Sequence, residues 1–226
     1  MTPTSRQCIL FFLRAPEKGR VKTRLAKSMG EDAALALYRS FVLDTLEMLA
    51  RTRYPVIICG HPKEKIPEID AWLGGRFPCW PQTGDSLGGK MSTAFSRAFS
   101  EGFDKAVLIG SDIPDLPERI IEQAFLAIGD QGTALGPSPD GGYYLVAFSA
   151  PAFLPRIFEN IPWGTEKVLE KTLAVLRAHD APVSLMEPWR DIDTAEDIEA
   201  LLKRHPDENR AAPRTLAYLR TDSPLR

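Results

Sequence analysis

An aspartate directly follows one of the most apolar runs of the chain. Residues 105–110 are an apolar run that predicts a buried strand, and Ser111 and Asp112 come next. A carboxylate at the carboxyl end of such a strand suits a hard divalent cation, because Mg²⁺ or Mn²⁺ combines one or two protein carboxylates with phosphate oxygens. Asp115 is expected to have another role, as the N-cap of a helix that begins near Leu116. We therefore assign the metal and a catalytic role to Asp112, with Ser111 as a candidate ligand-binding residue.

A second acidic cluster lies near the end of the chain. Thr194 followed by Asp197 has the pattern of a capping box, with Asp in place of the preferred Glu or Gln. That pattern accounts for these two residues but leaves Asp191 and Asp193 unexplained. Two carboxylates on either side of a polyphosphate could share its cation.

The loop after the first predicted strand is rich in cations. It holds five basic residues and one acid around a central glycine. A solvated charged loop is the alternative, but the position between a buried strand and a long helix favours phosphate binding, for which Arg offers a planar fork and Lys a point charge. The candidate phosphate-binding residues are Arg14, Lys18, Gly19, Arg20, Lys22 and Arg24.

A glycine-rich segment, residues 82–91, has the residue count of a P-loop but not its chemistry. Met91 stands where that motif needs Ser or Thr for Mg²⁺, and the preceding run is broken by two prolines. We exclude a P-loop and expect the glycines to shape a loop around a flat or bulky part of a ligand. The candidate binding residues are Gln82, Gly88, Gly89 and Lys90.

A third loop, residues 137–142, contains the turn signal Asp-Gly-Gly. A plain hairpin turn is one interpretation, and a backbone that approaches a ligand closely is the other, since glycine permits both. Gly141 and Gly142 are candidate binding residues. Asp140 is a candidate catalytic base for an acceptor hydroxyl.

The elements that must position these loops alternate between strand and helix. Short apolar runs at residues 8–13, 55–60, 105–110 and 143–148 predict strands buried on both faces. Helical periodicity separates them, and the alternation predicts one α/β/α three-layer domain with a mostly parallel sheet. We place this domain at residues 1–205 and expect a loosely ordered tail at 206–226. Ligands of such sheets bind at the carboxyl ends of the strands. Weaker strand candidates are 77–80, 133–136 and 181–186, and the expected helices are 31–51, 92–102, 117–128, 166–178 and 194–204.

Composition narrows the class of protein. The 226 residues include 28 Lys and Arg against 30 Asp and Glu, so the chain lacks the basic footprint of a duplex-binding protein. Its hydrophobic content of 44% excludes general disorder, and its three widely spaced cysteines favour reduced thiols over a zinc site. The first apolar run is too short for a signal peptide or a membrane span. We expect a cytoplasmic protein that binds no nucleic acid and has no membrane span; an oligomer is possible.

Taken in order, these segments resemble the uncharacterised glycosyltransferase-like branch of the nucleotide-diphospho-sugar transferase superfamily. The resemblance covers residues 8–204 and implies a GT-A, SpsA-like fold. It implies that the basic loop binds nucleotide phosphates, that residues 82–91 lie over the base and ribose, and that Asp112 and Asp193 bind Mg²⁺ or Mn²⁺. The chain departs from the family in having Ser-Asp-Ile in place of the D-x-D of many glycosyltransferases. The segments that carry the resemblance are FFLRAPEKGRVKTRL (11–25), QTGDSLGGKM (82–91), LIGSDIPDL (108–116), LGPSPDGGYYLVAF (135–148), WGT (163–165) and DIDTAEDIEAL (191–201).

Three functions follow from this resemblance. The first is metal-dependent glycosyl transfer from a nucleotide-diphosphate sugar to an unknown acceptor, with catalysis that is mainly electrostatic. The second is nucleotidyl transfer from an NTP to a small phosphorylated acceptor with release of pyrophosphate, a reaction that the basic loop would also serve. The third is a non-catalytic nucleotide-binding module.

Overall fold

One seven-stranded sheet forms the centre of the computed structural model, which describes residues 6–206 and 211–222. The strand order is β3-β2-β1-β4-β6-β5-β7, and only β6 runs antiparallel to its neighbours. The predicted mostly parallel sheet is therefore confirmed, and the weaker strand candidates belong to it. The strands are β1 (Gln7–Arg14), β2 (Val56–His61), β3 (Cys79–Pro81), β4 (Lys105–Gly110), β5 (Thr133–Pro137), β6 (Tyr143–Ser149) and β7 (Val183–Leu185).

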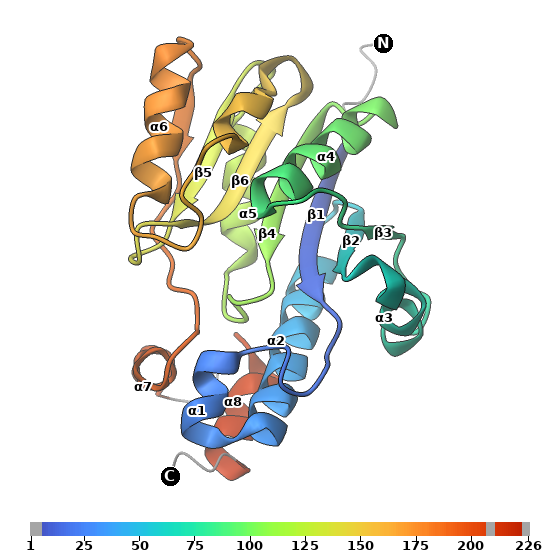
Figure 1. Cartoon of the computed structure of the whole chain (residues 1–226), viewed down its shortest axis with the longest axis vertical. Coiled ribbons are helices and arrows are strands. Elements are labelled where there is room, and N and C mark those ends of the chain that lie inside the picture. Colours follow the sequence, from blue (N-terminus) through green and yellow to red (C-terminus); the bar gives the residue numbers. More distant parts are fainter. Residues whose placement is uncertain (1–5, 207–210, 223–226) are drawn as a thin grey trace.

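Helices cover both faces of the sheet (Figure 1). One face packs against α2 (Glu31–Arg51), α3 (Ile66–Trp72) and α5 (Glu118–Ala127) around a core that includes Phe11 and Ile109. The other face packs against α4 (Leu87–Ser100) and α6 (Val168–Ala178), around Leu10 and Phe148. The strand side chains alternate between the two cores, because successive residues of a strand point to opposite faces. The three-layer prediction is thereby confirmed, and three short 3₁₀ turns complete the connections at Lys63–Lys65, Ala150–Ala152 and Pro155–Phe158.

A separate group of helices lies beyond the carboxyl ends of the strands, at the bottom of Figure 1. It consists of α1 (Thr23–Met29), the first part of α2, α7 (Ala195–Arg204) and α8 (Pro213–Thr221), which share a third apolar cluster that includes Leu25, Phe41 and Leu201. Through Leu25 and Ile192 this cluster joins the end of the basic loop and the acidic segment to one body. The helix α1 was not expected from the sequence.

The expected loose tail is corrected for residues 211–222. Helix α8 packs against α2, and Leu216 and Leu219 are buried between them. Asp44 of α2, fully buried, accepts hydrogen bonds from the backbone amides of Arg214 (3.1 Å) and Thr215 (2.8 Å). This carboxylate supplies the cap that the sequence of α8 lacks, since Ala212 precedes its first residue. Residues 207–210 and 223–226 of the expected tail lie outside the described residues.

The helix α4 begins five residues earlier than the sequence analysis placed it. Ser86 adopts an extended backbone and its hydroxyl accepts a hydrogen bond from the amide of Gly89 (3.0 Å), which starts the helix at Leu87. Two glycines in the first turn hid this start, because glycine is a poor helix former. As a result Lys90 lies on a helix and not on a loop. None of the described helices is long and apolar enough to cross a membrane.

Candidate functional site

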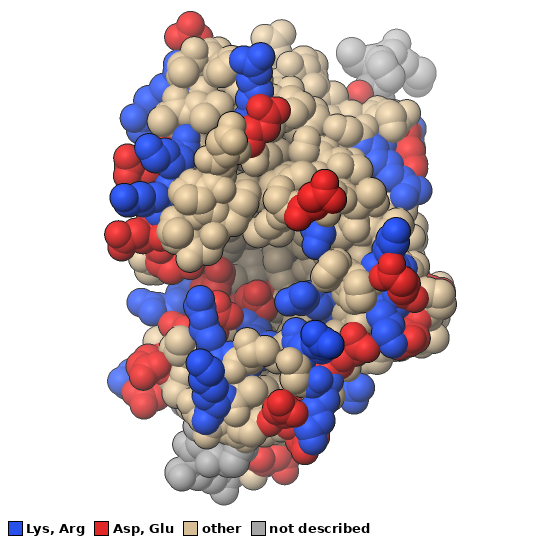
Figure 2. Space-filling view, in the orientation of Figure 1, with Lys and Arg blue, Asp and Glu red and all other residues tan. Residues whose placement is uncertain are grey.

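A cavity of about 610 Å³ opens at the carboxyl ends of β1, β2 and β4. Strand β1 lies between β2 and β4: β2 and β3 are added on one side of β1, and β4 on the other. This is a topological switch point, where open α/β sheets bind ligands. Figure 2 shows this face hollowed at its centre, with acidic and basic side chains along the lower rim of the hollow. The cavity floor is apolar, with Phe12, Leu108 and Val146 from three adjacent strands. The charged side chains come from the ends of β1 and β2, from the loops beyond the strands, and from the first turns of α1 and α4.

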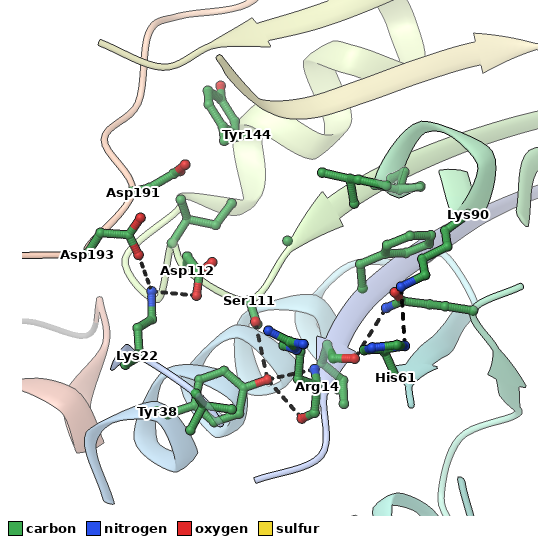
Figure 3. Close-up of a pocket in the computed structure, with 18 of the residues that line it drawn as sticks. Arg14, Lys22, Tyr38, His61, Lys90, Ser111, Asp112, Tyr144, Asp191 and Asp193 are labelled. Atoms are coloured by element: carbon green, nitrogen blue, oxygen red, sulfur yellow. Dashed lines mark hydrogen bonds and ion pairs between the residues drawn. The ribbon is translucent and has the colours of Figure 1, made fainter. Parts of the chain in front are cut away.

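Lys22 lies at the centre of the acidic end of this cavity (Figure 3). Its ammonium is 2.5 Å from Asp112 Oδ1 and 2.9 Å from Asp193 Oδ1, and it donates a hydrogen bond to the carbonyl of Ile192 (2.7 Å). The side chain is only 3% exposed. Burial alone would lower the pKa of Lys22, but the two carboxylates outweigh it and raise that pKa. Lys22 therefore offsets one of the two carboxylate charges and orients both aspartates.

Two loops that are distant in sequence meet around these aspartates. The amide of Ile192 donates a 2.9 Å hydrogen bond to the carbonyl of Asp112. Below it, the buried carboxylate of Asp115 accepts hydrogen bonds from the indole of Trp189 (3.1 Å) and from His205 Nε2 (3.0 Å), and it also pairs with Arg204. Asp115 thus joins the Asp112 loop to the C-terminal acidic segment.

The predicted N-cap role of Asp115 is wrong. Helix α5 begins at Glu118 after Pro117, and no side chain caps it. Asp115 is fully buried and meets partners from α7 and the segment before it. Burial would raise the pKa of Asp115, but hydrogen bonds from His205 and Trp189 and the charge of Arg204 together lower it. Its carboxylate is therefore a structural anion.

The capping box before α7 is confirmed. Thr194 accepts a hydrogen bond from the amide of Asp197, and Asp197 accepts one from the amide of Thr194 (2.9 Å). Asp191 and Asp193 remain free of that role and line the cavity. Asp191 is half-buried, and its burial together with the charges of Asp112 and Asp140 raises its pKa to about 8. In the sequence, Asp191 is an acid that the capping pattern does not explain, and no motif gives it a role.

The structure brings nine of the predicted site residues to the cavity wall and leaves the others outside it. Those that line the cavity are Arg14, Arg20, Lys22, Arg24, Gln82, Lys90, Ser111, Asp112 and Asp193. Those that do not are Lys18, Gly19, Gly88, Gly89, Asp140, Gly141 and Gly142. The contacts of Lys18, Gly88 and the turn at 140–142 explain why these residues lie outside the cavity wall.

Lys18 pairs with Asp32 (2.7 Å) on the surface, so its charge is directed away from the cavity. Gly88 packs so closely that a Cβ there would lie 2.4 Å from the carbonyl of Phe158 and 2.9 Å from Trp163 Nε1. This glycine therefore serves helix packing, in contrast to the expected ligand contact.

The hairpin interpretation of residues 137–142 is confirmed, because β5 and β6 pair antiparallel on either side of the turn. Asp140 Oδ1 accepts a hydrogen bond from the amide of Gly142 (2.9 Å), which closes the turn. The close backbone approach occurs at Gly141, where φ is +85° and a Cβ would lie 2.1 Å from the carbonyl of Glu166. The approaching group is thus part of the protein itself. Asp140 does not line the cavity, although its charge contributes to the raised pKa of Asp191.

Tyr38 and His61 line the cavity as well, although neither is a site residue predicted from the sequence. The hydroxyl of Tyr38 donates to the carbonyl of Arg14 (2.9 Å) and accepts from its amide (2.8 Å), so Tyr38 fixes the start of the basic loop. Burial raises the pKa of Tyr38 above its ordinary value. His61 ends β2, and its Nδ1 lies 3.3 Å from the ammonium of Lys90. Tyr38 belonged to an apolar helical stripe and His61 to no pattern, so neither carried a recognisable signal.

The donor set at the acidic end suits a hard cation that is shared with phosphate oxygens. Asp112 and Asp193 are 44% and 42% exposed and turn toward the cavity. Lys22 uses one oxygen of each, and the guanidinium of Arg24, at the mouth of the cavity, lies 3.6 Å from the second oxygen of Asp193. Two carboxylates are the number that Mg²⁺ commonly takes from a protein when phosphates complete its shell. Within residues 6–206 and 211–222, no three His, Cys, Asp or Glu side chains converge on one point as a complete protein metal site would require.

Comparisons with known proteins agree on the architecture. Residues 44–165 match a family described as "Uncharacterized protein conserved in bacteria (DUF2064)". The crystal structure of a candidate nucleotide-diphospho-sugar transferase from Desulfovibrio desulfuricans G20 is 38% identical, with a TM-score of 0.89 over 96% of each chain. Among curated proteins, no sequence matches.

Two enzymes of known activity share the fold at low sequence identity. A CMP:2-keto-3-deoxy-manno-octonic acid synthetase complexed with CTP is 11% identical, with a TM-score of 0.54 over 88% of this chain and 99% of its own. The 4-diphosphocytidyl-2C-methyl-D-erythritol synthase of Anaerococcus prevotii DSM 20548 is 13% identical, with a TM-score of 0.57 over 88% and 97%. With the Desulfovibrio structure, these confirm the predicted nucleotide-diphospho-sugar transferase type of fold.

Proposed function

We propose that this chain, which belongs to the DUF2064 family of uncharacterised bacterial proteins, is a nucleotide-dependent transferase that acts at the cavity below β1 and β4. The observation that carries the proposal is the convergence of Asp112 and Asp193 on Lys22 at a topological switch point. Carboxylates held in this way can share a divalent cation with a diphosphate. The more specific proposal is glycosyl transfer from a nucleotide-diphosphate sugar, which the description of the Desulfovibrio relative supports.

In this reaction an acceptor hydroxyl forms a bond to the anomeric carbon of the sugar while the bond from that carbon to the diphosphate oxygen breaks. The nucleoside diphosphate leaves with the electron pair, and the hydroxyl proton passes to a base or to water. A bound Mg²⁺ or Mn²⁺ supplies charge neutralisation for the leaving diphosphate. Asp112 and Asp193 hold that ion, and Lys22 keeps both carboxylates in place.

The remaining residues of the cavity bind and orient the substrate in this proposal. Arg14, Arg20 and Arg24 present guanidinium groups to phosphate oxygens, for which a planar fork is well suited. Ser111 and Gln82 also line the cavity, and because the amide nitrogen of Gln82 donates to the carbonyls of Leu13 (3.3 Å) and Cys59 (2.7 Å), its carbonyl oxygen is the group left for a ligand. Asp140 lies in the turn outside the cavity wall, where its charge still acts on Asp191, and it is the proposed base for the acceptor hydroxyl.

Nucleotidyl transfer is the second candidate, and the similarity of the fold to a CTP-bound synthetase favours it. In that reaction a phosphorylated acceptor attacks the α-phosphate of an NTP and pyrophosphate leaves. The same aspartates and cation would serve. A panel of nucleotide-diphosphate sugars and NTPs separates the two reactions, since the first releases a nucleoside diphosphate and the second pyrophosphate, whereas a binding module releases neither.

The metal assignment is tested by calorimetric titration of nucleotide with and without Mn²⁺. In the wild type, metal affinity should be weak alone and rise with nucleotide, and the coupling must be reciprocal. Asp112→Asn and Asp193→Asn should each abolish the coupling in a protein that still folds, with a lower melting temperature because each removes one of the two charges that hold Lys22. Asp130→Asn, at a 96% exposed carboxylate away from the cavity, is the control. Equal coupling in the wild type and in Asp112→Asn would refute the metal site.

A further inference from the structure

The charged groups of the cavity are divided between two ends. Figure 3 shows Asp112, Asp191 and Asp193 around Lys22 at one end, His61 and Lys90 at the other, and Arg14 between them. The cationic end runs from Arg14, at the middle of the cavity, to Lys90, and it is assembled from three elements: Arg14 ends β1, His61 ends β2, and Lys90 lies in the first turn of α4.

The cations of the two ends differ in their partners. Lys22 is neutralised by two carboxylates. By contrast, across the part of the chain that the structure describes, no carboxylate lies within ion-pair distance of the Arg14 guanidinium or the Lys90 ammonium. The contact that the ammonium of Lys90 makes is with His61 Nδ1, at 3.3 Å. An ammonium only donates hydrogen bonds, so Nδ1 accepts and the proton of the neutral ring lies on Nε2.

The electrostatics of this end are those of like charges held together. Burial and the charge of Arg14 lower the pKa of Lys90. Burial, then the charges of Lys90 and Arg14, lower the pKa of His61, while the more distant Glu64 raises it slightly. Positive groups that repel one another beside a cavity are stabilised when an anion binds between them.

We infer that Arg14, His61 and Lys90 form a subsite for an oxyanion, phosphate or carboxylate, at the end of the cavity opposite Asp112 and Asp193. Arg14 and Lys90 supply the charge, and His61 orients the Lys90 ammonium through Nδ1. Neither the basic loop nor the glycine-rich segment alone predicts this arrangement, since His61 comes from a third part of the chain.

This inference deepens the proposed function. It rests on that function for the identity of the molecule that carries the anion. If the diphosphate of the nucleotide lies at the Asp112–Asp193 end, the second anionic group belongs to the acceptor, which is then a phosphorylated or carboxylate-bearing compound. The other source is the nucleotide's own phosphate chain reaching across the cavity.

The first test is calorimetric titration of inorganic phosphate without divalent cation. Lys90→Met and Arg14→Met should each weaken phosphate binding about tenfold or more, the scale of a hydrogen bond to a charged group. Lys63→Met, at an exposed lysine two residues after His61 and outside the cavity wall, should leave it unchanged. Equal phosphate affinity in the wild type and Lys90→Met would overturn the subsite.

A second test needs no variant. In the wild-type protein, phosphate should shift the ring NMR signals of His61 and leave those of the exposed His179, which is bonded to the carbonyl of Val175, unchanged. Absence of a His61 shift would overturn the inference. So would a Lys90→Met variant that loses affinity for an unphosphorylated nucleoside but keeps it for phosphate, because Lys90 would then contact the base.

The source of the anion is decided by repeating the phosphate titration with saturating nucleoside diphosphate. Persistent phosphate binding assigns the subsite to the acceptor, and competition assigns it to the nucleotide; both support an oxyanion subsite. Phosphate binding is measured here without metal or turnover. Its failure would therefore leave the Asp112–Asp193 coupling standing, and loss of that coupling would leave the subsite standing.

Discussion

The amide of Ile192 donates a hydrogen bond of 2.9 Å to the carbonyl of Asp112, and this bond fastens the C-terminal acidic segment to the loop that follows β4. Because Lys22 also donates to the carbonyl of Ile192, one residue connects all three loops at the acidic end of the cavity. The backbone bond keeps Asp112 and Asp193 in register whatever their charge. Substitutions of the side chains that hold these loops should therefore show which residues stabilise the fold and which act in ligand binding.

Asp115→Asn should destabilise the protein by about 3 kcal/mol at neutral pH, because loss of the buried carboxylate leaves the charge of Arg204 uncompensated and weakens the hydrogen bonds from His205 and Trp189. The pKa of Asp115 is lowered in the fold, so its contribution is complete above about pH 4 and is lost as pH falls through the folded pKa. Urea unfolding from pH 3 to 8 should show the two proteins converging at acid pH. A constant difference over the whole range would contradict an ionised Asp115.

Lys22→Met should lower the free energy of unfolding by about 1–3 kcal/mol at pH 7, since Asp112 and Asp193 then repel each other but remain partly solvated. The pKa of Lys22 is raised in the fold, so its contribution is complete below about pH 10.4 and is lost only as pH rises through the folded pKa. Lys18→Met, at a surface pair, is the control. Thermal denaturation of both variants checks this, and equal stability of the two would argue against a buried, paired Lys22.

Asp44→Ala should release the start of α8 and lower stability by about 2 kcal/mol, the upper range for the loss of a helix cap. Hydrogen exchange should then be faster at the amides of residues 214–221 than in the sheet. Asp44→Asn should keep most of the protection, because Asn caps a helix about as well as Asp. If exchange in α8 were fast already in the wild type, its packing against α2 would be refuted.

Gly141→Ala should destabilise the fold by about 2 kcal/mol or more, because φ is +85° and the added Cβ would meet the backbone of Glu166. Gly142→Ala should cost much less, since its Cβ would meet only the side chain of Asp140, at 3.1 Å. Chemical denaturation of the two variants makes the comparison. A larger loss of stability in Gly142→Ala than in Gly141→Ala would contradict this and show that Gly142 is the more constrained position.

The sequence by itself determined the layers of the fold and the loops on which chemistry could occur. Apolar runs such as 105–110 encode strands buried on both faces, and helical periodicity encodes the elements between them, because both patterns depend on the local geometry of the backbone. The turn at 137–142 and the capping box at Thr194 are similarly local, and both are present. The start of α4 and the short helix α1 were not predicted, because glycines in the first and charged residues in the second obscure the helical periodicity.

Only the tertiary structure decided which charges meet. Five cations of one loop look equivalent in sequence, yet Lys22 is buried between two aspartates and Lys18 faces solvent. Asp115 looked like a cap and is instead bound by residues of α7, and His61 joins Lys90 from another strand end. The physical reason is that charge pairing depends on distances across the fold. Strand order and helix packing set those distances, and no local pattern of residues encodes them.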